Sequence, residues 1–412
     1  MKRRVVITGM GTVNPLANNP ASYWEALIAG KSGIDKITRF DTSDFAVQIA
    51  GEVKNLDQSD YFEPGETRRM DRYAIYAMIS AMQAMEDSGI DLDALDHNKA
   101  GVIVGSGIGG IETFEDQTRS LVNRGPRRVS PYFVPMMISD IAAGYISMRY
   151  NLKGPNYSVT SACATATHAV GNAVRHIQYG DADFMVAGGA EASITPLAVA
   201  GFQNMKALAK WDGNPTEASR PFDKERCGFI MGEGAGVVTL EDYESAKARG
   251  ANIYAEIVGV GYSADAYHIT MPAPEGEGAA RAMQIALDDA GLNPGDVDYI
   301  NAHGTSTPLN DATESAAIKN VFKDYARDGL IVSSTKSMTG HLLGAAGGIE
   351  LLAVVEAIRN NLVPPTINYE NPDPDCDLNY SPNEPTEKDI TVALSNTFGF
   401  GGHNAVVAVR QV

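Results

Sequence analysis

Helix-spaced apolar residues recur along the chain and alternate with short apolar runs. In residues 75–82, the apolar side chains stand at i, i+3, i+4 and i+7, so they lie on one face of a helix. The same spacing recurs at 170–177, which Gly180 follows as a C-terminal stop, and at 351–358. Val- and Ile-rich runs between these segments are typical of buried strands. The pattern predicts an α/β fold.

Several segments resemble one another and keep the same order along the chain. They comprise an opening apolar strand, a helix that ends in Gly, and a glycine-rich turn before an apolar strand. Because chance similarity rarely keeps its order, we predict two homologous halves, 1–250 and 251–412. No low-complexity linker separates them, so we expect a tightly packed interface, which is a common place for a functional site. The matched pairs are 4–11 with 255–261, 81–89 with 282–291, and 229–238 with 398–407.

Composition and charge narrow the possible functions. The 412 residues include 33 Lys and Arg against 51 Asp and Glu, which gives a net charge of −18. Binding to nucleic acid or anionic lipid relies on basic surfaces, so neither is expected. The three cysteines are too few and too scattered for a disulfide framework, which favours a reducing compartment. No signal peptide or apolar run of about 18 residues is recognised, so we expect a cytoplasmic location without membrane spans.

Glycine-rich turns imitate nucleotide-binding motifs. Residues 105–110 match G-x-G-x-x-G, but the cationic stretch 123–128 follows where that fold requires an acidic residue. We interpret these glycines as places where chain segments approach closely. The sequence has no Gly-x-Ser-x-Gly elbow and no Cys/His pairs at metal-ligand spacing, so no catalytic metal site is predicted.

Cys163 is the first candidate for chemistry. Residues 157–168 indicate a strand, a sharp turn and a helix that begins near this cysteine. A thiol at a helix N-terminus gains thiolate character from the helix dipole and the free amides. Taken alone, a cysteine flanked by alanines is more often a small core residue. Cys227 and Cys376 have no comparable setting and are assigned no chemistry.

Two segments of the second half supply the remaining candidates. His303 lies in an Asn-Ala-His-Gly-Thr-Ser-Thr turn after a predicted strand, and Lys336 and His341 lead into a helix of small residues. Within the repeat, this last segment occupies the place that Cys163 occupies in the first half. Two-fold pseudosymmetry would therefore bring His341 to face Cys163 across the interface. We expect the three signals to converge on one site.

These segments resemble those of the β-ketoacyl-acyl carrier protein synthases, in particular the elongating type II enzymes of fatty-acid synthesis. The resemblance covers nearly the whole chain. It rests on Cys163 in Thr-Ser-Ala-Cys, His303, Lys336, His341 and the tail 396–402, which reads Asn-Thr-Phe-Gly-Phe-Gly-Gly. It implies the thiolase-like fold, in which two βα halves form five layers, α-β-α-β-α, and a homodimer.

The resemblance also implies a mechanism. Cys163 would take the acyl chain from a carrier thioester, and malonyl on a second carrier would then lose carbon dioxide. His303 and His341 would donate hydrogen bonds to the malonyl thioester oxygen, where negative charge develops. The backbone N–H groups of Cys163 and Phe400 would hold the oxyanion formed at the acyl-cysteine.

Further residues match positions with assigned roles in the family. Lys336 would be a structural charge paired with Glu350. No cofactor is implied, except for a structural monovalent cation. Without the family match, most of these residues would be interpreted as ordinary core or turn residues. The matches are Ile108 and Phe202 for the acyl-pocket wall, Phe398 and Phe400 for a gate, Thr270, Thr305 and Thr307 for the pantetheine arm, and Asn301, Glu350, Ser395 and Asn396 for the cation.

Clustered cations reconcile the acidic chain with an acidic partner. The resemblance implies that acyl carrier protein, which is strongly acidic, docks on this protein. Two short segments concentrate five of the 33 Lys and Arg residues. A local basic face can bind an acidic protein although the net charge is negative. The predicted docking face consists of Arg68, Arg69, Arg124, Arg127, Arg128, Lys206 and Lys210.

Some features depart from the family pattern. Residues 164–167 read Ala-Thr-Ala-Thr where Thr-Ser-Gly is common, and His403 stands where Thr is frequent. These departures leave open whether the role is housekeeping elongation or a polyketide-type condensation. Three other functions fit less well. A biosynthetic thiolase requires a second cysteine in the tail, an initiating synthase pairs His with Asn, and a non-catalytic chain-length partner lacks the nucleophile.

Overall fold

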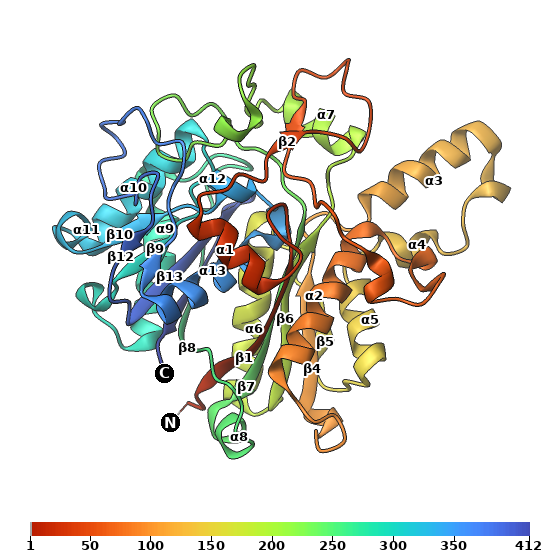
Figure 1. The fold of residues 1–412 in the computed structure, drawn as a ribbon, viewed down its shortest axis with the longest axis horizontal. Helices are drawn as coiled ribbons and strands as arrows, with labels where there is room; N and C mark the ends of the chain where they lie inside the picture. The colour runs from red at the N-terminus through yellow and green to blue at the C-terminus, as the bar shows by residue number, and fades with distance from the viewer. Residues whose placement is uncertain (1) are drawn as a thin grey trace.

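One mixed sheet runs through the molecule. The computed structural model describes residues 2–412 and places ten strands in the order β5-β4-β6-β7-β1-β8-β14-β13-β9-β10 (Figure 1). The strands are β1 (Val5–Val13), β4 (Ala100–Gly105), β5 (Asn156–Tyr157), β6 (Phe184–Glu191), β7 (Gly234–Asp242), β8 (Ala255–Ala264), β9 (Tyr299–Asn301), β10 (Ile331–Ser333), β13 (Val392–Gly399) and β14 (His403–Arg410).

The strand order repeats between the two parts of the chain. From edge to centre, the first part runs β5-β4-β6-β7-β1 and the second runs β10-β9-β13-β14-β8. The two sets join where β1 pairs antiparallel with β8 over Val5–Ile7 and Ala255–Ile257. The structure therefore has the internal repetition that the matched segments predict. The placement of the boundary at residue 250 stays a prediction.

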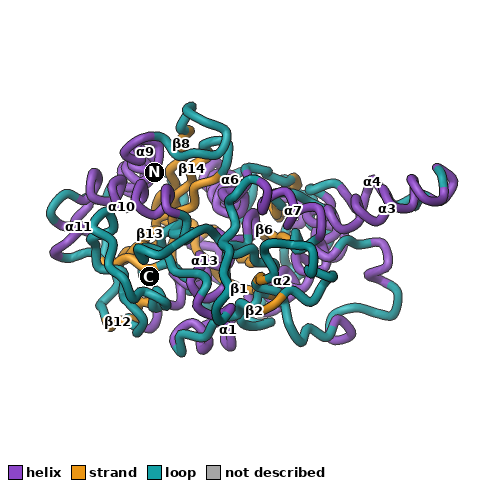
Figure 2. Tube along the Cα trace, turned by 90° about the horizontal axis from the view of Figure 1, so that it is seen from above, coloured by secondary structure: helices purple, strands orange, loops and turns teal. Residues whose placement is uncertain are grey.

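Helices form three layers around and between the strands. α6 (Thr165–Tyr179) and α13 (Ala346–Asn360) lie between the two strand sets and share one apolar core with both (Figure 2). α2 (Arg72–Ser88) and α5 (Ile141–Tyr150) cover the outer face of the first set. α9 (Glu277–Ala290) and α10 (Pro308–Phe322) cover that of the second. This arrangement gives the five layers α-β-α-β-α and confirms the expected fold.

Both faces of each strand set are buried, which explains the continuous apolar runs. Val238 of β7 packs in the core around α6 and α13, whereas its neighbour Val237 packs in the outer core with α2. Successive side chains of a strand point to opposite faces, so a strand covered on both sides needs apolar residues throughout. Each predicted helix face lies in a helix of the inner or outer layers, and Gly180 ends α6 with a φ of 80°.

The remaining elements connect or cover these layers. α3 and α4 extend away from the body (Figure 1). No helix formed by residues 2–412 combines the length and apolar character needed to cross a membrane. The other elements are α1 (Pro20–Ile28), α3 (Ile111–Arg124), α4 (Phe133–Met137), α7 (Pro196–Asn204), α8 (Tyr243–Ala248), α11 (Tyr325–Asp328), α12 (Lys336–Thr339), and the short strands β2 (Asp35–Lys36), β3 (Ile49–Ala50), β11 (Leu362–Val363) and β12 (Thr386–Glu387).

Candidate active site

Cys163 lies in a short turn between β5 and α6. Residues Ala162–Ala164 form one turn of 3-10 helix, and α6 itself begins at Thr165, slightly later than the sequence indicates. Ala162 has a φ of 50°, in the left-handed region that residues other than glycine rarely adopt. The turn leaves Cys163 with 8% of its surface exposed, at the wall of a cavity.

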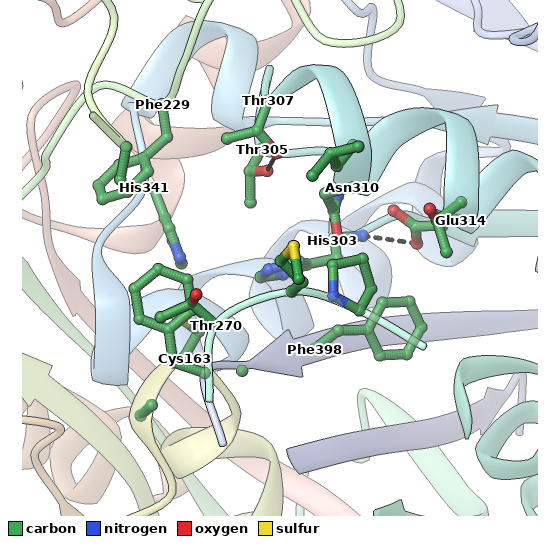
Figure 3. A pocket seen from close by; sticks show the side chains of 18 of the residues that line it. Cys163, Phe229, Thr270, His303, Thr305, Thr307, Asn310, Glu314, His341 and Phe398 are labelled. Atoms are coloured by element: carbon green, nitrogen blue, oxygen red, sulfur yellow. Dashed lines mark hydrogen bonds between the residues drawn. The ribbon is translucent and has the colours of Figure 1, made fainter. Parts of the chain in front are cut away.

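His303 follows strand β9 and is held through its backbone. The N–H groups of His303 and Gly304 donate to the two carboxylate oxygens of Glu314 on α10, at 2.9 and 2.8 Å (Figure 3). Asn396 donates to the same carboxylate at 3.3 Å. The His303 ring is left free to face the cavity, because its fixing contacts use only main-chain atoms.

His341 enters the site from the other side, just after α12 and Gly340. Its N–H donates to the carbonyl of Ile230 at 2.7 Å. Its ring lies edge-on to Phe229, with centroids 5.3 Å apart, and to His303, with centroids 5.2 Å apart and planes at 86°. The two imidazoles therefore meet at nearly a right angle on the same cavity.

The three predicted reactive side chains converge. The sulfur of Cys163 and one ring nitrogen each of His303 and His341 lie within 4.8 Å of one another (Figure 3). They line a cavity of about 420 Å³. The first half contributes the thiol and the second half contributes both imidazoles, and His341 lies opposite Cys163 as the repeat argument expects. The arrangement places a nucleophile opposite two nitrogen donors.

Both histidines are neutral at physiological pH. Burial, followed by the positive charge of Lys336, lowers the pKa of His303 and that of His341 well below 6.5. A neutral imidazole carries one N–H and can donate one hydrogen bond. Within the described chain, Nδ1 of His303 and both ring nitrogens of His341 have no hydrogen-bond partner. The two rings are thus available to a substrate oxygen.

The thiol departs from the expectation based on its helix. Position at a helix N-terminus favours the thiolate, yet burial raises the pKa of Cys163 to about 12. The charge of Lys336 and an N–H from Phe400 act in the opposite direction and only reduce this effect. Cys163 is therefore a neutral thiol in the resting site. Its proton has to leave as the sulfur attacks.

Lys336 is buried and paired. Its ammonium group hydrogen-bonds the carboxylate of Glu350, and each side chain is 1% exposed. Burial raises the pKa of Glu350, and the attraction of Lys336 opposes that rise. The pair expected from the sequence is present. A buried ion pair of this kind fixes a positive charge beside the two histidines without contacting solvent.

The cavity wall contains the residues matched to the acyl and pantetheine groups. Ile108 lies in the turn between β4 and α3 and is 39% exposed. Phe202 of α7 packs against Phe400 at 6.4 Å between ring centroids. Phe398, at the end of β13, lies 5.8 Å from the His303 ring. Three threonines line the same cavity: Thr270 after β8, and Thr305 and Thr307, whose hydroxyls lie 3.0 Å apart.

The residues matched to a cation have unsatisfied buried atoms. Both polar side-chain atoms of Asn301, one oxygen of Glu350, and the side-chain oxygens of Ser395 and Asn396 are buried and unpaired among residues 2–412. Buried polar groups normally have partners, so these unpaired atoms require an explanation. Oxygen ligands of this kind fit a hard cation.

The predicted docking cations are all exposed. None of them forms an ion pair within the part of the chain that is described. The Arg69 guanidinium lies 4.2 Å from the centre of the Tyr132 ring, which brings the segment 66–69 against the linker between α3 and α4. Lys206 lies on the cavity rim. Arg68, Arg124, Arg127, Arg128 and Lys210 are the other members.

Two carboxylates of the site could not have been identified from the sequence. Glu314 braces the His303 turn, and Glu191 accepts hydrogen bonds from the N–H groups of Gly107 and Gly344, at 2.9 and 3.0 Å. Both act on main-chain N–H groups, which every residue except proline carries. Neither glutamate therefore leaves a pattern in the sequence.

Comparison with known proteins identifies relatives over the whole chain. Residues 2–246 match the family model for the beta-ketoacyl synthase N-terminal domain, and residues 254–370 match that for its C-terminal domain. A 3-oxoacyl-[acyl-carrier-protein] synthase 2 of Staphylococcus aureus (strain COL) is 54% identical over 409 residues, covering 99% of this chain and 98% of the relative. One from Synechocystis is 50% identical over 410 residues, covering 100% and 98%.

Solved structures of ketosynthases also match this chain over its whole length. A ketosynthase in complex with its type II PKS acyl-carrier protein is 36% identical with a TM-score of 0.93, and each chain is covered fully. A beta-ketoacyl synthase from Burkholderia phymatum STM815 gives the same identity, coverage and TM-score.

Proposed function

The chain belongs to the beta-ketoacyl synthase family, and from this premise we propose how its residues perform the condensation. It is an acyltransferase of fatty-acid elongation, which joins an acyl group to malonyl-acyl carrier protein and releases carbon dioxide. The observation that carries the residue roles is the convergence of Cys163, His303 and His341 within 4.8 Å on one cavity. The high identity to elongating synthases favours this role over a polyketide-type condensation.

The first step transfers the acyl group to the enzyme. The sulfur of Cys163 attacks the carbonyl of the acyl-carrier thioester, and the carbon–sulfur bond to the carrier breaks. The thiol proton leaves Cys163 and ends on the carrier's pantetheine sulfur. One ring nitrogen of each of His303 and His341 lies within 4.8 Å of the sulfur, so either imidazole can pass the proton on. The N–H of Phe400, which donates to the Cys163 sulfur, supports the oxyanion together with the Cys163 N–H.

The second step makes the carbon–carbon bond. Malonyl on a second carrier loses carbon dioxide, and its thioester oxygen becomes an enolate oxygen. Neutral His303 and His341 each donate an N–H to that oxygen, which stabilises the developing charge. The enolate carbon attacks the acyl-cysteine carbonyl, the carbon–sulfur bond to Cys163 breaks, and the released thiolate takes up a proton from solvent. The product is 3-oxoacyl-acyl carrier protein.

Lys336 acts through its charge. Neither Lys336 nor its partner Glu350 is among the residues that line the cavity, and both side chains are 1% exposed. Burial lowers the pKa of both histidines and the Lys336 charge adds to that effect, so both imidazoles are neutral, which is the form that can donate during decarboxylation. The direct test of the whole proposal is mass spectrometry after incubation with an acyl-carrier thioester, which should add one acyl group at Cys163.

The acyl-carrier protein is the partner, and we place its docking on the exposed cations. Reversing charge at Arg127 and Arg128 (to Glu) should raise KM for the acyl-carrier substrate about 10-fold or more and leave kcat unchanged, because the patch only steers and holds the acidic carrier. Steady-state kinetics at low and high salt measure this, and the wild-type KM should rise with salt. Arg281→Glu, which removes an exposed arginine of α9 that pairs with Glu277, is the matched control. An unchanged KM in the double variant contradicts the docking face.

The unpaired atoms of the four residues matched to a cation lead us to propose a structural monovalent cation. Asn301, Glu350, Ser395 and Asn396 would hold it, and it would supply positive charge but take no part in a reaction step. A cation at 100 times its dissociation constant would stabilise the fold by about 2.7 kcal/mol.

The melting temperature should therefore fall when sodium and potassium are replaced by tetramethylammonium at equal ionic strength. Ser395→Ala should weaken that difference, whereas Ser337→Ala, which removes a buried hydroxyl that already has partners, should preserve it. No dependence on the cation in the wild type would contradict the site.

We also propose that two copies associate through the first half. Strand β5 is the edge of the sheet, and its two residues are exposed. Helix α5 packs beside β5 and leaves Met148 67% exposed, and the projecting arm α3–α4 leaves Val122 and Val134 exposed at 77% and 57%. An open strand edge and uncovered apolar side chains together favour a protein contact. Analytical ultracentrifugation should give twice the chain mass of 43.9 kDa. A monomer at micromolar concentration would contradict the proposal.

The compartment is proposed to be the cytoplasm. All three cysteines are free in the described structure, which agrees with a reducing environment. Cell fractionation with an antibody against the protein tests this location, and recovery in a secreted fraction would contradict it.

A further inference from the structure

We propose that Thr165 is a positioning residue that holds Cys163 in its reactive geometry, an inference that rests on the proposed acyl transfer to Cys163. Thr165 is the first residue of α6 and is fully buried. Its hydroxyl accepts a hydrogen bond from the N–H of Ser161 at 2.9 Å. The same hydroxyl donates one to the carbonyl of Ala162 at 2.8 Å. It therefore ties together the two residues that directly precede the nucleophile.

The tie acts on a strained residue. Ala162 has a φ of 50°, a conformation that the Cβ of an L-residue disfavours. Such a conformation persists only where the surroundings enforce it. Because Cys163 follows Ala162 directly, relaxation of that dihedral would turn the sulfur away from the two histidines. The hydroxyl of Thr165 donates to the carbonyl of the strained residue itself. This hydrogen bond therefore restrains the backbone conformation that directs the Cys163 sulfur toward the histidines.

The second half of the protein contains the same turn without the hydroxyl. Leu343 has a φ of 49°, and Leu343–Ala345 form the corresponding 3-10 turn at the start of α13. Ala346 stands where Thr165 stands, with φ and ψ of −52° and −55° against −53° and −56°. The chain thus forms the strained turn with alanine at this position. The turn alone does not account for a threonine hydroxyl in the first half.

The two turns differ in what supports them from the other side. The N–H of Gly344, the counterpart of the Cys163 N–H, donates to Glu191 at 3.0 Å. The Cys163 N–H pairs with no acceptor in residues 2–412 and is assigned to the oxyanion. A carboxylate placed there would occupy the position of the substrate oxygen. The catalytic turn therefore lacks the brace that its counterpart has, and Thr165 supplies support from the helix side instead.

The neighbouring sequence provides a matched control. Thr165 belongs to the stretch 164–167 that departs from the family pattern, and Thr167 is a second buried threonine two residues further on. The Thr167 hydroxyl has no hydrogen-bond partner in the described chain. Replacement of either threonine by valine keeps its volume and removes its hydroxyl. Only Thr165→Val removes hydrogen bonds to the turn that carries Cys163.

The test compares Thr165→Val, Thr165→Ser and Thr167→Val with the wild type. Mass spectrometry follows the rate at which an acyl-carrier thioester acylates Cys163, and carbon dioxide release follows malonyl-carrier decarboxylation. We expect Thr165→Val to slow acylation about 100-fold, the loss that a misplaced reacting group produces, with decarboxylation unchanged. Thr165→Ser keeps the hydroxyl and should restore the wild-type acylation rate. Thr167→Val should match the wild type in both assays.

Three outcomes would overturn the inference: wild-type acylation by Thr165→Val, equal losses in Thr165→Val and Thr167→Val, or a parallel loss of acylation and decarboxylation. Should Thr165→Val fail to fold, Thr165→Ala takes its place, since the second half accepts alanine in this turn. A thermal melt establishes folding for each variant. Failure of the proposed function itself would appear separately, as a wild-type protein that gains no acyl group on Cys163.

Discussion

Cys163→Ala should lose condensation by about 10,000-fold or more, because the variant has no sulfur to carry the acyl group between the two half-reactions. Incubation with an acyl-carrier thioester should leave its mass unchanged, whereas the wild type gains one acyl group. The loss should appear in kcat. Carrier binding should persist, since the cations assigned to docking are untouched. Intact-protein mass spectrometry and an elongation assay with malonyl carrier measure the two effects.

The other two cysteines provide controls for that result. Cys227 is exposed on the cavity rim, and Cys376 is buried away from it in the core with α9 and α10. Cys227→Ala and Cys376→Ala should both be acylated at Cys163 like the wild type. If Cys163→Ala still gained an acyl group, or if Cys227→Ala gained none, the assignment of Cys163 as the nucleophile would be wrong.

The layered fold was only partly accessible from periodicity. The helix faces at 75–82, 170–177 and 351–358 follow from spacing alone, and all three lie in helices. The faces of the strands cannot be assigned from spacing in the same way. Val237 and Val238 are both apolar because both faces of β7 are covered, so no alternation shows which core each one joins. The five-layer order came from the family resemblance.

The reactive groups were predictable because their side chains carry the chemistry. Cys163, His303 and His341 each stand in a small-residue turn, and the internal repeat brings the first and last together. Glu314 was not predictable, since it bonds main-chain N–H groups. The direction in which the pKa of the Cys163 thiol shifts was also predicted wrongly. The helix start is local and visible in the sequence, whereas the burial that raises the pKa of Cys163 to about 12 arises from distant segments.

His303→Ala and His341→Ala should each slow malonyl decarboxylation by about 100- to 1,000-fold, the loss expected when one hydrogen-bond donor to a developing oxyanion is removed. Each variant should still accept an acyl group on Cys163, because the carrier thioester is attacked by the sulfur and its oxyanion is assigned to main-chain N–H groups. Carbon dioxide release from malonyl carrier measures the first effect, and mass spectrometry the second. His176→Ala, a change in a histidine paired with Asp181 outside the cavity, should alter neither.

The pH dependence separates donation by neutral imidazoles from catalysis by charged ones. Burial and Lys336 lower the pKa of His303 and that of His341 well below 6.5, so both rings stay neutral as the pH falls from about 8 to about 6. Protonation would begin only at lower pH, and decarboxylation should therefore be flat across that range. If instead the rate rose tenfold toward pH 6, the reactive form would be an imidazolium, and the assigned roles would be wrong. Normal decarboxylation in both alanine variants would likewise remove the two histidines from the mechanism.

Because the rings lie at nearly a right angle, with centroids 5.2 Å apart, they can donate hydrogen bonds to one oxygen from two directions. The double variant should then lose little more than the worse single variant, since one donor alone cannot hold the enolate in place.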